Sequence, residues 1–288
     1  MPTFAVTMNP FFQDYTTAYG TIPFGKLKNE HYVPAIHQGI TDAKAEIDAI
    51  VHTNDTPTFE NVIVALENSG ELLTKVTSAF FNLNSAETSD EMQEIAQEIS
   101  PLLSAHGNDI AMNAGLFAKV KEVFDQGFDG LTQEQKTLVE NAYKGFTRNG
   151  ANLNDTDKEK LREIDARKAK LSLIFGERVL KESNAFEMLI TDENELDGLP
   201  EGIREAAQGM ATAKEKGGCL FTLDYPSYIP FVTYSTRREL REKMYKAFSS
   251  KAFQSNENNN EEVIQEIVQL RSERANLLGF ESHADYVL

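Results

Sequence analysis

The five histidines are the residues best suited to chemistry, because imidazole is a common zinc ligand and general base. A zinc hydrolase typically carries H-E-x-x-H, whose histidines bind the metal and whose glutamate activates the metal-bound water. The histidines here are His31, His37, His52, His106 and His283. None is followed by glutamate, and the inverted motif H-x-x-E-H fails because Leu27 occupies its first position. The sequence therefore predicts no metal site.

Structural roles are predicted for the histidines instead. His31 and His37 lie six residues apart, which places them on different sides of a helix and makes them poor joint ligands. His37 borders an apolar face, so we expect a packed, hydrogen-bonded side chain. His106 precedes Gly107 and is predicted to serve a helix end, and His283 is given a structural role as well.

Other reactive groups do not suggest a site. Cys219 is the only cysteine, which excludes an internal disulfide, and its apolar surroundings predict a buried, inert thiol. Nucleophile-elbow, dinucleotide and P-loop motifs are absent from the sequence. Acidic pairs at helical spacing, such as Glu94 and Glu98, are typical of solvated helix faces. We therefore nominate no catalytic, cofactor-binding or metal-binding residue in this chain.

Two surface features each support a hypothesis of peptide binding. A basic island could meet a peptide carboxylate or an acidic face, although a charged helix exterior is the simpler interpretation. An aromatic cluster could contact peptide side chains, or fill a gap between helices. The basic island is Arg237, Arg238, Arg241, Lys243 and Lys246, and the aromatic cluster is Tyr225, Tyr228, Phe231 and Tyr234.

The composition narrows the class of protein. The 288 residues carry a formal net charge of −17, which argues against nucleic acid and anionic membranes as partners. The first twenty residues lack the basic and apolar regions of a signal peptide, and no apolar run is long enough to span a membrane. These features favour the cytoplasm, or the periplasm if a signal peptide has been removed.

Helical periodicity dominates the chain and predicts a mostly α fold. One apolar face is formed by Val33, Ile36, Ile40, Ala43, Ile47 and Ile50, and Gly70 is predicted to mark a bend. Capping patterns predict further helix starts, and a last helix has Arg274 within its apolar period. The predicted capping residues are Thr56 before Pro57, and Thr88, Thr132, Thr156 and Thr236, while Pro101 and Gly107 could interrupt the helix between them.

Two stretches depart from this helical pattern. The turn-rich run "GFTRNGANLNDTDKEK" predicts a domain boundary, with 1–149 before it and 150–288 after it. Residues 184–234 are rich in aromatic and β-branched types, which allows at most a short β hairpin near 219–234. Pro226 and Pro230 are expected to limit that segment to edge or irregular structure.

Six segments of the chain, in order, are characteristic of a known family: "HYVPAIHQGI", "PTFENVIVALENSG", "SPLLSAHGNDIAMNAGLFAKV", "RNGANLNDTDKEKLREI", "LDYPSYIPFVTYSTRRELREKMYKAF" and "RSERANLLGFESHADYVL". They resemble the peptidyl-dipeptidase (dipeptidyl carboxypeptidase) branch of the thimet-oligopeptidase family. Each segment alone is weak evidence, but six in register over essentially the whole chain are specific for the family.

The resemblance implies a clam-like, helical zinc metallopeptidase with two lobes around a channel that admits short peptides. It implies that 1–149 belongs to the first lobe and 150–288 begins the second. The family's zinc helix lies beyond the equivalent of Leu288, so the resemblance implies no zinc bound by this chain. Its partners would be short peptides and the remaining carboxy-terminal part of the same polypeptide.

We therefore expect an amino-terminal fragment of a zinc peptidase that releases C-terminal dipeptides. The fragment would supply channel wall and be inactive alone. The alternatives are a non-catalytic helical peptide-binding or scaffold protein, and a chain whose resemblance is structural only.

Overall fold

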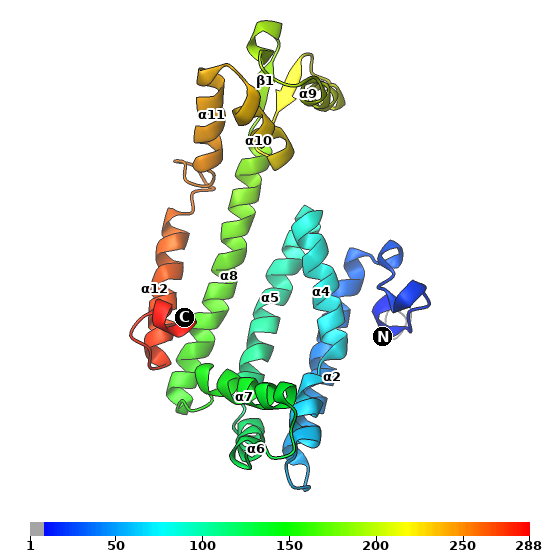
Figure 1. Cartoon of the computed structure of the whole chain (residues 1–288), viewed down its shortest axis with the longest axis vertical. Helices are drawn as coiled ribbons and strands as arrows, with labels where there is room; N and C mark the ends of the chain where they lie inside the picture. Colours follow the sequence, from blue (N-terminus) through cyan, green and yellow to red (C-terminus); the bar gives the residue numbers. More distant parts are fainter. Residues whose placement is uncertain (1–8) are drawn as a thin grey trace. The chain divides into compact units, whose positions relative to one another are not determined.

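The computed structural model describes residues 9–288, which form a multi-helix, mostly α chain with one two-stranded sheet (Figure 1). The chain divides into two compact units. Unit 1 comprises the described residues up to Lys170 together with Gln269–Leu288, and unit 2 comprises Leu171–Val268. The lobe boundary at residue 149, which concerns the whole protein, stays a prediction.

Unit 1 is built from helices, and many of their buried apolar residues form a core cluster. It begins with four 3₁₀ turns, Pro10–Phe12, Ala18–Gly20, Phe24–Lys26 and Asn29–His31. The longer elements are α2 (Tyr32–His52), a π-helical turn (Phe59–Val64), α3 (Ala65–Glu67), α4 (Glu71–Ala86), α5 (Asp90–Ala111), α6 (Ala114–Asp125), α7 (Gln133–Arg148), the first half of α8 (Asp155–Ala185), and α13 (His283–Val287).

Helices α2 and α4 approach each other closely because Gly39 lacks a side chain. A Cβ atom at Gly39 would lie 2.9 Å from the backbone of Leu73 on α4. The Tyr32 ring packs on the rings of Phe80 and Phe11, with 5.1 Å and 5.6 Å between the ring centroids. The predicted apolar face is confirmed, since Ile36, Ala43, Ile47 and Ile50 are buried. Gly70 marks the expected bend, with φ of 72°.

Unit 2 combines a two-stranded sheet with several helices. Its elements are the second half of α8, β1 (Met188–Ile190), a 3₁₀ turn (Glu193–Leu196), α9 (Glu201–Ala213), β2 (Cys219–Phe221), α10 (Tyr225–Tyr234) and α11 (Arg238–Ser249). Helix α12 (Glu261–Leu277) begins in unit 2 and ends in unit 1. The strands are antiparallel, with Met188 opposite Phe221 and Ile190 opposite Cys219. Strand β2 therefore pairs across α9 with β1 and forms no hairpin within 219–234.

The proline-based expectations are wrong in both places. Helix α5 runs through Pro101 and Gly107 without interruption. Pro226 lies in the first turn of α10, where a helix has backbone N–H groups without intrahelical partners, and Pro230 lies inside the same helix. The next residue, Phe231, is buried in the unit 2 core, so packing supports this helix although Pro230 has no N–H to donate.

The helix starts are shifted by one or two residues from most predicted caps. Thr132 caps α7 as expected. Gln135 completes the capping box, because its Oε1 accepts a hydrogen bond from the Thr132 backbone N–H at 2.9 Å. Elsewhere Thr58, Ser89 and Asn154 accept the hydrogen bonds predicted for Thr56, Thr88 and Thr156. Thr236 instead donates to Asp197 at 2.7 Å. At the first three of these starts the true cap is a Ser, Thr or Asn one or two residues away, so packing decides among equivalent side chains, whereas α11 begins after Arg237 without a side-chain cap.

Candidate functional site

His31, just before α2, and the histidines on α2 take local roles. The Nδ1 atom of His31 accepts a hydrogen bond from the Lys28 backbone N–H at 3.0 Å. The Nδ1 atom of His52 lies 2.8 Å from the carbonyl oxygen of Asp48. His37 is exposed, which corrects the expectation of a packed side chain. These contacts fix helix geometry and bring no two histidines together.

His106 and His283 each have a buried Nδ1 atom that has no hydrogen-bond partner among the described residues. His106 lies inside α5 with 7% of its surface exposed, so the prediction that it serves a helix end is wrong. Burial lowers its pKa, with Lys44 acting in the same direction and Asp109 opposing. Burial, followed by Arg271, Lys168 and Arg274, lowers the pKa of His283. Both imidazoles therefore favour the neutral form.

Within residues 9–288, no group of three or more His, Cys, Asp or Glu side chains is placed to hold a metal ion. The zinc that the family resemblance implies accordingly does not fit the described residues. None of the helices in this part of the chain has the length and apolar character needed to span a membrane.

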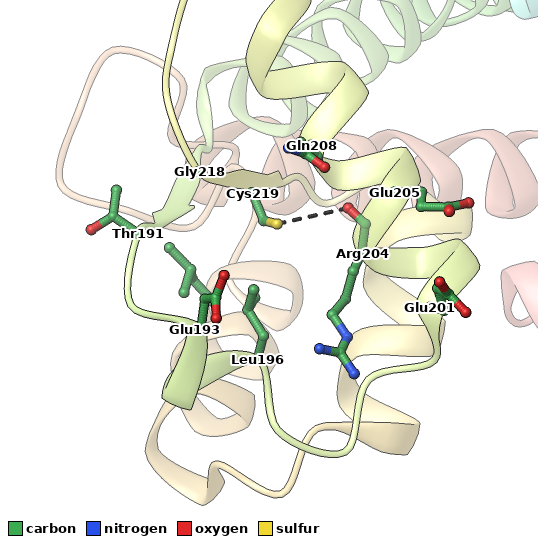
Figure 2. A pocket seen from close by; sticks show the side chains of 10 residues that line it. Thr191, Glu193, Leu196, Glu201, Arg204, Glu205, Gln208, Gly218 and Cys219 are labelled. Carbon is green, nitrogen blue, oxygen red and sulfur yellow. Dashed lines mark hydrogen bonds between the residues drawn. The ribbon is translucent and has the colours of Figure 1, made fainter.

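A polar cleft of about 450 Å³ lies in unit 2 between α9 and the β1–β2 ladder (Figure 2). Helix α9 contributes Glu201, Arg204, Glu205 and Gln208, because these positions recur on one face. Arg204 is anchored by donation from its Nε to the carbonyl of Leu199 at 3.0 Å. The remaining lining residues are Ile190, Thr191, Glu193, Leu196, Gly218 and Cys219.

The cleft has no reactive nucleophile. The Cys219 thiol donates to the carbonyl of Arg204 at 3.7 Å, shown as the dashed line in Figure 2. Burial raises the pKa of this thiol, although Arg204 opposes the shift. A thiol with a raised pKa is a poor nucleophile at neutral pH, as expected for an inert cysteine. The carboxylates of Glu193, Glu201 and Glu205 leave the lining net acidic.

The aromatic cluster divides between core and surface. Tyr228 and Phe231 are buried, and Phe231 packs edge-on against Phe221 at 4.7 Å. Tyr225 and Tyr234 keep 67% and 53% of their surfaces exposed. The cluster therefore fills the unit 2 core with two rings and offers the other two to solvent.

The basic island surrounds the start of α11. Arg237 donates from Nε to the carbonyl of Asn194 at 3.2 Å, and Arg241 donates to the carbonyl of Ser235 at 2.5 Å. Lys246 pairs with Glu242 at 2.6 Å. Arg238 and Lys243 are exposed. Two of the five cations thus hold backbone turns, and the others face solvent.

A polar network in unit 1 was not predicted. Arg274 pairs with Asp165 and also donates to Asn149 Oδ1 at 3.1 Å, and the Tyr286 hydroxyl donates to the same oxygen at 3.0 Å. Arg148 donates to the Tyr286 carbonyl and lies 5.2 Å from the Tyr286 ring centroid. The signal was an arginine within the apolar period of α12, because such a cation needs a carboxylate partner.

Comparison with known proteins finds relatives that are named as peptidases. Residues 231–288 match Peptidase family M3. The chain is 35% identical over 273 residues, 93% of its length, to oligopeptidase A of Salmonella typhimurium, and covers 40% of that protein. It is 36% identical over 287 residues, 96% of its length, to dipeptidyl carboxypeptidase of Escherichia coli, and covers 41% of it. A probable cytosolic oligopeptidase A of Arabidopsis thaliana is 28% identical over 97% of the chain, which covers 40% of that protein.

The chain spans about two fifths of the length of these curated relatives. The similarity extends across both units, since it covers at least 93% of the chain in each comparison. The matched family is also the one that the six sequence segments of this chain resemble. These findings identify the chain as part of a protein of the thimet-oligopeptidase family, peptidase family M3.

Proposed function

We propose that the whole protein is a zinc metallopeptidase that hydrolyses short peptides, and that this chain supplies wall and support for its substrate channel. The observation that carries this proposal is similarity over at least 93% of the chain to proteins named oligopeptidase A and dipeptidyl carboxypeptidase. Its short-peptide substrates are inferred from those names.

The chemistry is assigned to residues outside this chain. The sequence lacks H-E-x-x-H, and the described side chains do not fit a zinc ion. We therefore propose no catalytic, cofactor-binding or metal-binding residue in the 288 residues and no zinc bound by them. The chain by itself is then inactive.

The inactivity is tested with the purified chain, added zinc and an amino-blocked hexapeptide, followed by mass spectrometry. We expect no product that scales with the amount of protein. Stoichiometric cleavage that a chelator abolishes would overturn the assignment of the chemistry to other residues. A preparation of the whole protein serves as the positive control.

Release of C-terminal dipeptides is the finer proposal. Its support is the 36% identity to dipeptidyl carboxypeptidase, but oligopeptidase A is nearly as similar at 35%. The whole protein should shorten an amino-blocked hexapeptide by two residues at a time, and the free C-terminal carboxylate should be required. Internal cleavage of a peptide with an amidated C-terminus would favour oligopeptidase action.

The remaining part of the same polypeptide is the proposed partner of α12. Ile264 and Val268 lie one helical turn apart on α12, with 44% and 58% of their surfaces exposed. Replacing both by aspartate should leave the chain folded but destabilise the whole protein. Equal stability of the two forms of the whole protein would contradict this docking.

A cytoplasmic location is proposed from the relative named as a probable cytosolic oligopeptidase A. Fractionation of cells that express the whole protein tests it.

The second candidate function, a non-catalytic peptide-binding protein, is favoured by the exposed tyrosines on α10 and α11. Saturable peptide binding by the whole protein without any cleavage would select it.

A further inference from the structure

Helices α10 and α11 border an open groove of about 310 Å³ in unit 2. We name it the α10–α11 groove, and its lining residues are Val232, Arg238, Arg241, Glu242 and Tyr245. On α11, Arg238, Arg241 and Tyr245 follow one another at steps of three and four, which aligns them along one face. Two guanidinium groups and one aromatic ring are therefore presented side by side.

An apolar stripe on α10 continues the groove. Tyr225, Ile229 and Val232 recur at helical spacing, and Tyr225 and Ile229 keep 67% and 44% of their surfaces exposed. The Tyr225 ring contacts Phe248 edge-on at 5.8 Å, and Phe248 in turn stacks on the buried Tyr228 at 4.0 Å. The exposed stripe is thus fixed to the core of unit 2 and presents a rigid apolar surface.

The cations of the groove exceed its anions. Glu242 is the only carboxylate in its lining and is paired with Lys246 at 2.6 Å. The hydrogen bond from Lys246, with a further contribution from Arg238, lowers the pKa of Glu242 and keeps it ionised. Arg241 is held in place by its bond to the Ser235 carbonyl, and within residues 9–288 Arg238 forms no ion pair. Positive charge is concentrated here although the whole chain carries −17.

We propose that the α10–α11 groove binds the C-terminal carboxylate of a short peptide. The guanidinium groups of Arg238 and Arg241 contact the carboxylate, since arginine matches its two oxygens in a planar fork. The last apolar side chains of the peptide pack on Tyr245 and on the α10 stripe. A single carboxylate beside an apolar group suits this surface, whereas the overall negative field repels polyanions.

This inference rests on the proposed function only in choosing a peptide as the ligand. Binding is measured without cleavage, so failure of binding leaves the peptidase proposal standing. Conversely, a whole protein without peptidase activity leaves the groove proposal intact.

The test is a titration of the isotope-labelled chain, observed by two-dimensional amide NMR. The probes are N-acetyl-alanyl-phenylalanine as the free acid and as its C-terminal amide. We expect saturable shifts at Val232 and Tyr245 with a dissociation constant on the order of 1 mM. The amide should bind about fivefold more weakly, the upper range for an exposed ion pair. Equal affinity for acid and amide, or shifts confined to other elements, would overturn the proposal.

Matched variants separate the groove from general electrostatics. Arg238→Gln should bring the affinity for the acid closer to that for the amide, because the carboxylate then keeps only Arg241 as a guanidinium partner. Lys243→Gln removes the same charge from an exposed position on the same helix outside the groove lining and should preserve the preference. Equal losses in the two variants would mean non-specific attraction and sink the proposal.

The apolar half of the groove is tested by Tyr245→Ala, which should weaken acid and amide alike. Tyr234→Ala truncates a tyrosine that is similarly exposed but does not line the groove, and it should bind as the unaltered chain does. The amide spectra of all variants report whether unit 2 keeps its fold. Unchanged affinity in a folded Tyr245→Ala chain would contradict apolar contact with the peptide.

Discussion

Arg274 and Asp165 are 109 residues apart in sequence, yet Nε of the first lies 2.8 Å from Oδ1 of the second. Their side chains are only 11% and 15% exposed. Lys168 also contacts Asp165, at 3.4 Å, so one carboxylate serves two cations from different helices. The pair fixes the end of α12 against α8 within unit 1.

Asp165→Asn should lower the free energy of unfolding by about 2 to 3 kcal/mol, because it leaves the poorly solvated Arg274 without its counter-charge. Asp125→Asn is the control, since Asp125 pairs with Lys121 at the surface and is 56% exposed. The control should change stability by less than about 1 kcal/mol. Urea unfolding followed by circular dichroism checks both, and similar losses would contradict the importance of burial.

Gly198→Ala should destabilise unit 2 by about 3 kcal/mol or more, from a left-handed backbone and steric overlap together. The φ angle of Gly198 is +83°, and its added Cβ would lie 2.3 Å from the Tyr234 carbonyl oxygen. Gly209→Ala is the matched control in α9, where nothing lies within 4 Å. It should stabilise the helix by about 0.5 to 1 kcal/mol. Amide hydrogen exchange in unit 2 measures both, and a harmless Gly198→Ala would refute the contact.

Asn154→Ala should cost about 1 kcal/mol, because the side chain caps α8 by accepting from the Asp157 N–H at 2.9 Å. Thr156→Ala should be close to neutral, since Thr156 is exposed inside the first turn and is not the cap. The comparison uses exchange rates of the first α8 amides. A larger loss from Thr156→Ala would restore the helix start predicted from sequence.

Acidification should weaken unit 1 through His106. Its pKa in the folded state lies below the ordinary 6.5 through burial and Lys44, with Asp109 opposing. The unfolded chain therefore binds a proton first, and stability present above pH 6.5 is lost as the pH falls through the folded-state pKa. Lys44 reaches Asp109 from α2 at 2.9 Å, and Arg162 reaches it from α8 at 2.7 Å.

The variant His106→Gln should remove this part of the pH dependence in urea unfolding measured at several pH values. His37→Gln, at an exposed position of α2, should follow the unaltered chain. Parallel curves for the unaltered chain and His106→Gln would show that this imidazole does not contribute.

Local patterns predicted the helices because burial follows the helical period. Ile36, Ile47 and Ile50 were expected on one face and are buried together. The pairing of β1 with β2 could not be predicted, because each strand is only three residues long and the whole of α9 separates them along the sequence. Helix starts were missed where a neighbouring Ser, Thr or Asn could cap equally well, as Ser89 does beside Thr88.

The chemistry of the site was harder to predict from sequence. Motif searches could show which reactive arrangements are missing, but the groove depends on how α10 packs against α11. The sequence placed Arg238 in the basic island and gave no role to Tyr245. Only the fold aligns the two residues. The network around Asp165 depends in the same way on contacts between distant segments, which no local pattern encodes.

The β1–β2 ladder closes the chain on itself at residues 190 and 219, so α9 and its flanking turns form an excursion whose two ends are joined. Closing a longer loop costs only slightly more entropy, and the turn 214–217 is exposed. We therefore expect insertions at this turn to leave the register of the ladder fixed. A slip of that register by one residue would turn Leu189, now 44% exposed, into the core and expel Met188 and Ile190.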